Sequence, residues 1–307
     1  MHETLAEELS SGANPIVPDS EADETASRRS RWRLMQHIVL RSPSRSAGAA
    51  LALLALLIGL LGVWLAPDSP ILADYTAILG APSRAHLFGT DNIGRDVFSR
   101  VLNGAHISLE VAFVVVLVGA GIGTIIGLVA GYAGGLVDEI LMRLTDIFLA
   151  FPALVVALAM ASALGASITN VALSLMVVWW PYYARLIRGQ VLGLREREYV
   201  EAARAVGAGH ARVMLRHILP NSLTPLIVQM SLDVGFAILA VSSLSFIGLG
   251  AQPPTPEWGV MIADAQSYVR SAWWVATFPG LAITLTVIGF NLMADLLQDA
   301  LDPRLRA

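Results

Sequence analysis

The sequence predicts an all-α polytopic membrane protein with six transmembrane helices. Of its 307 residues, 55% are hydrophobic and only 14% are charged, which is too apolar for a soluble globular domain. The apolar residues also fall in blocks of about 20, the length that a helix needs to cross the hydrocarbon core. A backbone in lipid must satisfy its own hydrogen bonds, and the alternating pattern of a barrel is absent, so helices are predicted. The predicted spans are Ala47–Ala66, Ser108–Gly131, Ile147–Leu164, Ile168–Leu186, Leu223–Gly250 and Val275–Ala294.

Residues 1–46 are predicted to form a cytoplasmic N-terminal tail. The first 27 residues hold seven carboxylates and few large apolar side chains, a composition typical of disorder. Six arginines follow and lead into the first span. That span is not predicted to be a cleavable signal peptide, because it begins about 46 residues in and lacks a small-x-small cleavage site.

The arginines orient the predicted bundle. With both termini cytoplasmic, 16 of the 20 arginines lie on the inner side and four lie outside, as the positive-inside rule requires. Residues 47–306 then form the transmembrane domain. It carries an extracytoplasmic loop at 67–107 and a cytoplasmic loop at 195–221.

The cytoplasmic loop 195–221 reads as a helix, a glycine turn and a second helix. Glu201 lies four residues after Arg197 and three before Arg204, so its carboxylate is predicted to bridge both guanidinium groups. Gly207 is predicted to end the first helix in the left-handed conformation, and Pro220 to begin the fifth span. From the residues alone, two functions stay equally open: a helix pair lying on the membrane surface, and a docking element for a partner protein.

Residue types exclude several kinds of site. The chain has no cysteine, hence no disulfide framework, and no lysine, hence no standard P-loop. Its six histidines show no pair with metal-ligand spacing, so no metal site is predicted. No arrangement of a nucleophile with a base is evident, so no catalytic residue and no cofactor bound by this chain are predicted.

Polar residues mark two further places. Asp233 is the one carboxylate well inside an apolar block, with Gln229 one turn earlier on the same face. A role in a translocation pathway and a role in structural pairing are equally compatible with this pattern. Asp91, Arg95 and Asp96 precede the second span, where they could pair locally to shape the loop or serve an extracytoplasmic function.

The cytoplasmic loop resembles the EAA loop of ABC-importer permeases, the element that couples the permease to its ATPases. Further segments resemble the C-type permease subunits of dipeptide, oligopeptide and nickel importers, so that the resemblance extends over residues 43–306. Two positions depart from the pattern: His106 stands where the family usually has arginine, and Val241 stands where glutamate is common. The matching EAA segments are Glu201-Ala202-Ala203, Gly207 and Leu219-Pro220; the others are His86 to Arg100, Gly131 to Pro152, Leu244 to Gly259 and Asp299 to Arg306.

The resemblance implies a bacterial inner-membrane permease of type I, MetI-like architecture that imports di- or oligopeptides. It implies a homologous second permease, two ATPase subunits that use ATP and Mg²⁺, and an extracytoplasmic substrate-binding protein. The implied coupling residues are Glu201, Ala202, Ala203, Arg204, Gly207, Leu219 and Pro220.

Three alternatives stay open beside peptide import. The same subunit plan serves nickel or opine-like solutes. A stand-alone secondary transporter or channel would require carboxylate relays and often internal repeats, which a single Asp233 does not supply. A scaffold without transport would not need the glycine-marked loops.

Overall fold

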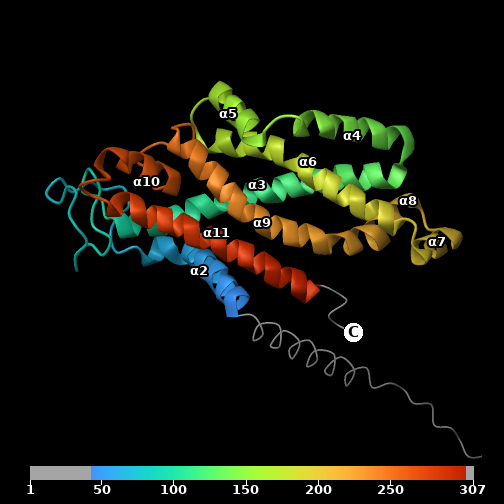
Figure 1. Ribbon diagram of the computed structural model, residues 1–307, viewed down its shortest axis with the longest axis horizontal. Coiled ribbons are helices and arrows are strands. Elements are labelled where there is room, and N and C mark those ends of the chain that lie inside the picture. The colour runs from blue at the N-terminus through green and yellow to red at the C-terminus, as the bar shows by residue number, and fades with distance from the viewer. Residues whose placement is uncertain (1–42, 302–307) are drawn as a thin grey trace, which may run out of the picture. The chain divides into compact units, whose positions relative to one another are not determined.

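The structure of the chain is a computed structural model that describes residues 43–301, and within that range it is helical with no strand (Figure 1). The disorder predicted for the first 27 residues falls outside the described residues, as do the last six residues. The helices of the described range are α2 (Pro43–Leu65), α3 (Val97–Ala133), α4 (Gly135–Leu149), α5 (Ala153–Leu164), α6 (Ile168–Leu194), α7 (Glu198–Ala205), α8 (His210–Arg212), α9 (Leu219–Phe246), α10 (Trp258–Ala265) and α11 (Trp274–Leu301).

Helix α3 lies at the centre of the bundle. It packs most extensively along α6 and also contacts α2 and α9, while α11 covers α2 and α9 (Figure 1). The main core cluster draws on α3, α9 and α11, and a second cluster joins α5, α6 and α9. Each long helix also leaves large apolar side chains exposed, as expected where lipid or another subunit covers them.

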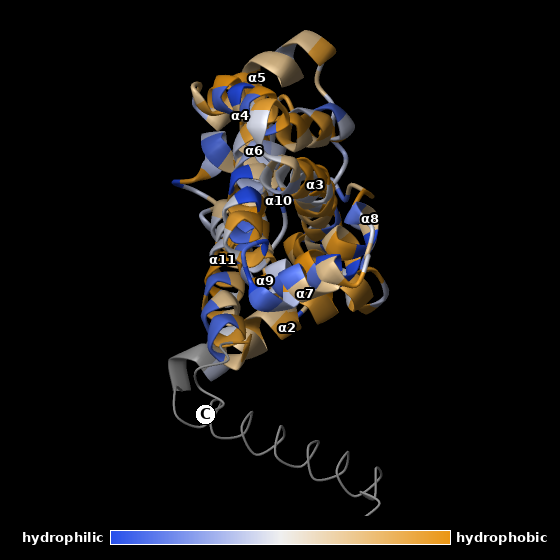
Figure 2. Ribbon diagram, turned by 90° about the vertical axis from the view of Figure 1, so that its right-hand side faces the viewer, coloured by the Kyte–Doolittle hydropathy of each residue, from blue (hydrophilic) through white to orange (hydrophobic). Residues whose placement is uncertain are grey.

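Within residues 43–301, four helical stretches are long and apolar enough to cross a membrane: Ser46–Leu65, Val97–Ala133, His210–Phe246 and Trp274–Leu301. In Figure 2 the visible part of α3 is mostly in the hydrophobic colours. The α4–α5 pair passes the same test as one bent unit, which makes up to five spans. Helix α6 is long enough at 27 residues, but its cluster from Trp179 to Tyr183 and two later arginines lower its hydropathy. The predicted count of six therefore stays a prediction, while the helical membrane fold is confirmed.

The third predicted span, Ile147–Leu164, was wrong as a single helix. The chain bends by 80° between α4 and α5. Pro152 lies at the bend in an extended conformation, as the N-cap of α5, where its missing N–H breaks no helical hydrogen bond. Helix α5 has only 12 residues, about 18 Å of rise, which is too short to cross a bilayer alone.

The second and fifth predicted spans begin earlier than expected. Helix α3 starts at Val97 rather than Ser108, because the Asp96 side chain accepts a hydrogen bond from the Ser99 N–H and caps the helix. The loop before it is correspondingly shorter than the predicted 67–107. The fifth stretch starts at His210, since a π-helical turn from Val213 to Ile218 joins α8 to α9 without a break.

Glycine spacing explains how closely α3 and α6 approach. Gly119, Gly123, Gly127 and Gly131 recur every four residues on one face of α3, and each lies against α6. A Cβ built on Gly123 would lie 2.5 Å from the Trp180 carbonyl oxygen. The two backbones can therefore meet only where side chains are absent.

Candidate functional site

Helix α7 stands at one end of the bundle, the end opposite α10 (Figure 1). Val200 and Ala203 are buried and anchor it, whereas Glu201, Ala202 and Arg204 are exposed. This alternation places a small, charged surface outward on a short helix that is tied to the core. Val206, just past the helix, is 85% exposed, so an apolar side chain joins this surface.

The turn after α7 has the predicted conformation. Gly207 adopts a φ of +84°, the left-handed region that glycine occupies without strain. The Ala208 N–H donates to the Ala203 carbonyl at 3.0 Å, which closes the helix end. Of the remaining coupling candidates, Leu219 is half-buried and Pro220 is exposed at the first turn of α9.

The predicted bridge from Glu201 to Arg197 and Arg204 was wrong. Arg204 instead places its guanidinium carbon 5.3 Å from the centre of the Tyr132 ring, a cation–π contact with the end of α3. The Tyr132 hydroxyl in turn lies 2.9 Å from His210 Nδ1. Glu201 forms no ion pair or side-chain hydrogen bond with any residue that the structure describes, so its carboxylate is free for a partner.

The opposite end of the bundle holds a buried charge network, which confirms local pairing of Asp91 with Arg95. The Arg95 Nε donates to Asp91 at 2.6 Å, and the second Asp91 oxygen accepts the N–H groups of Ile93 and Arg95. Arg100 is 2% exposed and donates to the Pro70 and Pro254 carbonyls at 2.8 and 3.2 Å. These bonds tie the loop before α3 to the segment before α10.

Asp264 in α10 borders the same network, with its carboxylate 3.7 Å from the Arg95 guanidinium. Partial burial raises the pKa of Asp264 above its usual range, and the nearby arginines only partly oppose this effect. Asp264 makes the longest of the three ion-pair contacts in this network, in which Asp91 lies 2.6 Å from Arg95 and 3.6 Å from Arg100.

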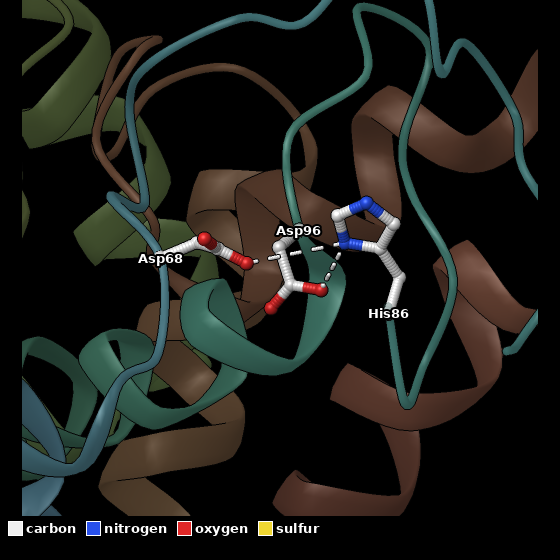
Figure 3. Close-up of side chains that lie close together, drawn as sticks. All are labelled: Asp68, His86 and Asp96. Atoms are coloured by element: carbon white, nitrogen blue, oxygen red, sulfur yellow. Dashed lines mark hydrogen bonds and ion pairs between the residues drawn. The ribbon is translucent and has the colours of Figure 1, made fainter. Parts of the chain in front are cut away.

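Asp96 pairs with His86 rather than with Arg95. His86 Nδ1 lies 3.0 Å from one Asp96 oxygen and 4.0 Å from Asp68, and the three side chains converge (Figure 3). The side-chain atoms of these three residues that could coordinate a metal ion all lie within 4.8 Å of one another. Both Asp96 oxygens already accept hydrogen bonds, one from His86 and one from the Ser99 N–H, so the group serves as a helix cap. Sequence spacing could not reveal this cluster, because its members come from separate parts of one loop.

Glu257 is a buried polar residue that the sequence did not single out. It is fully buried, and one oxygen accepts hydrogen bonds from the Ser108 and Ser242 hydroxyls at 3.3 Å. The other accepts the Val260 N–H at 3.0 Å and caps α10. Since Ser108 is 149 residues away, no local pattern could have indicated this junction of α3, α9 and α10.

Asp233 and Gln229 lie together in α9, as predicted from their spacing. Gln229 donates to the Asp233 carboxylate at 2.9 Å, and Asp233 is only 7% exposed. Both line a cavity of about 530 Å³ between α5, α6 and α9. An adjoining cavity of about 500 Å³ shares Tyr182 and Gln229 and extends toward Arg185.

Comparison with known proteins shows to which class of membrane protein this chain belongs. Residues 123–307 match the family described as the inner membrane component of binding-protein-dependent transport systems. The chain belongs to this permease family. It is therefore a multi-pass inner-membrane subunit of an ABC importer.

Relatives of the permease agree over most of its length. A probable D,D-dipeptide transport permease from Escherichia coli K12 is 48% identical, over 86% of this chain and 88% of its own. A dipeptide transport permease from Alkalihalophilus pseudofirmus is 46% identical over 75% of each chain. A glutathione transport permease from Pectobacterium atrosepticum is 43% identical over 95% of this chain and 96% of its own.

A solved structure supports the fold alone. The crystal structure of an amino acid ABC transporter with histidines aligns with a TM-score of 0.50, at 18% identity. The alignment covers 66% of the permease and 94% of that chain. The helical arrangement is thus shared with an ABC transporter.

Proposed function

We propose that the permease imports di- or oligopeptides and that α7 with the turn at Gly207 receives the motion of partner ATPases. The observation that carries the proposal is that α7 has one face buried in the core and the other face exposed. Val200 is fully buried in the main core, while Glu201 on the next position is exposed and has no partner within the described chain. A subunit that moves Glu201 would therefore also move the core of the bundle.

The peptide class is supported by the relatives. All three are named for transport of peptides: D,D-dipeptides, dipeptides and glutathione. In this proposal a second permease completes the pathway, the ATPases bind at the α7 end in the cytoplasm, and a substrate-binding protein docks at the α10 end. ATP hydrolysis then belongs to the partners, and Asp233 and Gln229 line the route.

The proposed mechanism is an alternation between inward-facing and outward-facing states. ATP-driven closure of the ATPases displaces α7, the turn at Gly207 transmits the displacement to α8, and the π-helical turn Val213–Ile218 continues it into α9 without a break. Because α9 carries Asp233 and Gln229, the same movement changes the cavity that these residues line. ATP can drive this alternation if the ATP-bound ATPases bind one of the two states more tightly than the other.

The test is uptake by proteoliposomes that contain both permeases, the ATPases and the binding protein. Glu201→Arg is expected to reduce ATP-dependent peptide uptake and co-purification of the ATPases at least about tenfold, since it reverses a charge at the docking surface. Arg270→Glu, an exposed charge reversal at the α10 end, is the matched control and should leave ATPase co-purification unchanged. Normal coupling in Glu201→Arg would exclude the proposed docking surface, and uptake without ATP would favour a secondary transporter.

A further inference from the structure

The cavity beside Asp233 combines a carboxylate with aromatic walls. Trp179 and Tyr182 of α6 line it together with Gln229 and Asp233 of α9. Its volume of about 530 Å³ is within the range of small-molecule sites. The remaining lining residues are Ala153, Leu154, Phe236, Leu239, Ala240 and Ser243, which are apolar apart from the one serine.

Asp233 has hydrogen-bond support but no balancing charge in the described part of the chain. Gln229 donates to it at 2.9 Å, the Tyr183 and Trp179 side chains lie within hydrogen-bonding reach, and no arginine among the described residues forms an ion pair with it. Arg185, which lines the adjoining cavity, is already paired with Asp146 at 2.6 Å. A carboxylate buried without a cation is costly, and the cost falls when a cation arrives.

Tyr183 places a buried hydroxyl beside Asp233. Its side chain is fully buried next to Asp233, yet its hydroxyl has no hydrogen-bond partner of good geometry among the described residues. Most buried hydroxyls in folded proteins are satisfied. The hydroxyl therefore faces the Asp233 carboxylate, and an ammonium group that enters beside them finds two oxygen atoms that can accept its hydrogen bonds.

We propose that Asp233 is a substrate-binding residue that receives the primary ammonium group of the transported solute. An ammonium group carries the missing positive charge and three hydrogen-bond donors, and the rings of Trp179 and Tyr182 favour a cation at their faces. This inference rests on the proposed peptide import, because a peptide with a free N-terminus is such a solute. The adjoining cavity toward Arg185 leaves room for the rest of the peptide.

The absence of cysteine from the chain gives a direct test. Ser243→Cys places one thiol in this chain, on an exposed position of the cavity wall. In the assembled transporter, its reaction rate is measured with a trimethylammonium-ethyl and a sulfonatoethyl methanethiosulfonate reagent, each normalised to a free thiol. A carboxylate in the cavity should favour the cationic reagent about tenfold, by concentrating cations locally.

Variants and competitors identify the carboxylate responsible. Adding Asp233→Asn should bring the rate ratio to about 1, while Asp233→Glu and the control Asp295→Asn should preserve it. Alanyl-alanine should slow labelling more than N-acetyl-alanyl-alanine, which lacks the ammonium group. Equal rates of the two reagents in the Ser243→Cys protein, no labelling by either, a ratio insensitive to Asp233→Asn, or equal protection by both peptides would each overturn the proposal.

This measurement needs neither ATP nor the substrate-binding protein. If the permease did not import peptides, ATP-dependent uptake by the wild-type complex would fail while the labelling ratio could still be measured. If Asp233 were only structural, uptake would proceed and the charge preference would be absent. The two failures are therefore distinguishable.

Discussion

At the residue scale, charged side chains of the permease differ in whether the chain itself satisfies them. Asp91 and Arg95 neutralise each other in a short buried pair, and their role is to hold the loop before α3. Glu201 and Asp233 have no countercharge in the described residues, and one is exposed while the other faces a cavity. Charges without an internal partner are therefore the better candidates for contact with other molecules.

Asp264 should make stability depend on pH. Because burial raises its pKa in the folded state, its contribution to stability is full below the unfolded value of 3.8 and is lost as the pH rises through the folded pKa. The wild-type protein should lose stability between about pH 4 and about pH 7, and Asp264→Asn is expected to make this decrease smaller. The measurement is the thermal unfolding midpoint of the purified complex as a function of pH.

Asp74 serves as a control of opposite sign. Hydrogen bonds from Thr76 lower the pKa of Asp74, so its contribution is present above its unfolded value and is lost as the pH falls through the folded pKa. Asp74→Asn should flatten the acidic side of the same profile. If the stability profiles of both variants matched the wild-type profile, neither carboxyl group would determine the pH dependence.

Gly207 is expected to resist substitution for conformational reasons alone. A Cβ at this position meets no atom within 4 Å, but the backbone φ of +84° disfavours any side chain. Gly207→Ala should destabilise the permease by about 1 kcal/mol. Gly193 in α6 has equally open surroundings and helical backbone, so Gly193→Ala should instead stabilise by up to about 1 kcal/mol. Equal effects of the two substitutions on the unfolding midpoint would contradict this explanation.

At the scale of elements, the sequence predicted most helices but not their junctions. Apolar blocks predict helices reliably because lipid leaves the backbone no other hydrogen-bond partners. The bend at Pro152 could have been predicted from Phe151-Pro152, since proline disfavours a helical residue before it. The π-helical start of α9 had no comparable signal, because Pro220 suggested a new helix where the chain continues.

The glycine spacing in α3 is a signal that sequence reasoning could have used and that supports a prediction. Gly123 and Gly121 differ by two positions, yet only Gly123 faces α6. Gly123→Ala would place its Cβ 2.5 Å from both the Trp180 carbonyl oxygen and the Tyr183 Cβ, and should destabilise by about 1–3 kcal/mol. Gly121→Ala meets nothing within 4 Å and should not destabilise. Thermal unfolding of the two variants in the same detergent compares them, and equal midpoints would argue against close α3–α6 packing.

At the scale of the whole molecule, candidate sites lie at both ends and in the middle of the bundle. The α7 segment was predicted from sequence because its residues are contiguous, and Asp233 because a carboxylate is rare in an apolar block. The networks around Arg100 and Glu257 were not, because their partners are up to 154 residues distant. Contacts of that range follow from helix packing and have no local pattern.

The two ends of the bundle should face opposite sides of the membrane, with α7 inside. Val206 and Leu72 are 85% and 72% exposed at the two ends, and the chain offers no competing cysteine. In cells that lack the ATPase subunits, Val206→Cys should react with a membrane-impermeant maleimide only in inside-out vesicles, and Leu72→Cys only in intact spheroplasts. The physical reason is the excess of arginine on the α7 side, which the membrane insertion process retains in the cytoplasm. The reverse labelling pattern would invert the orientation, and it would then place the ATPase-docking surface on a side of the membrane where ATP is not supplied.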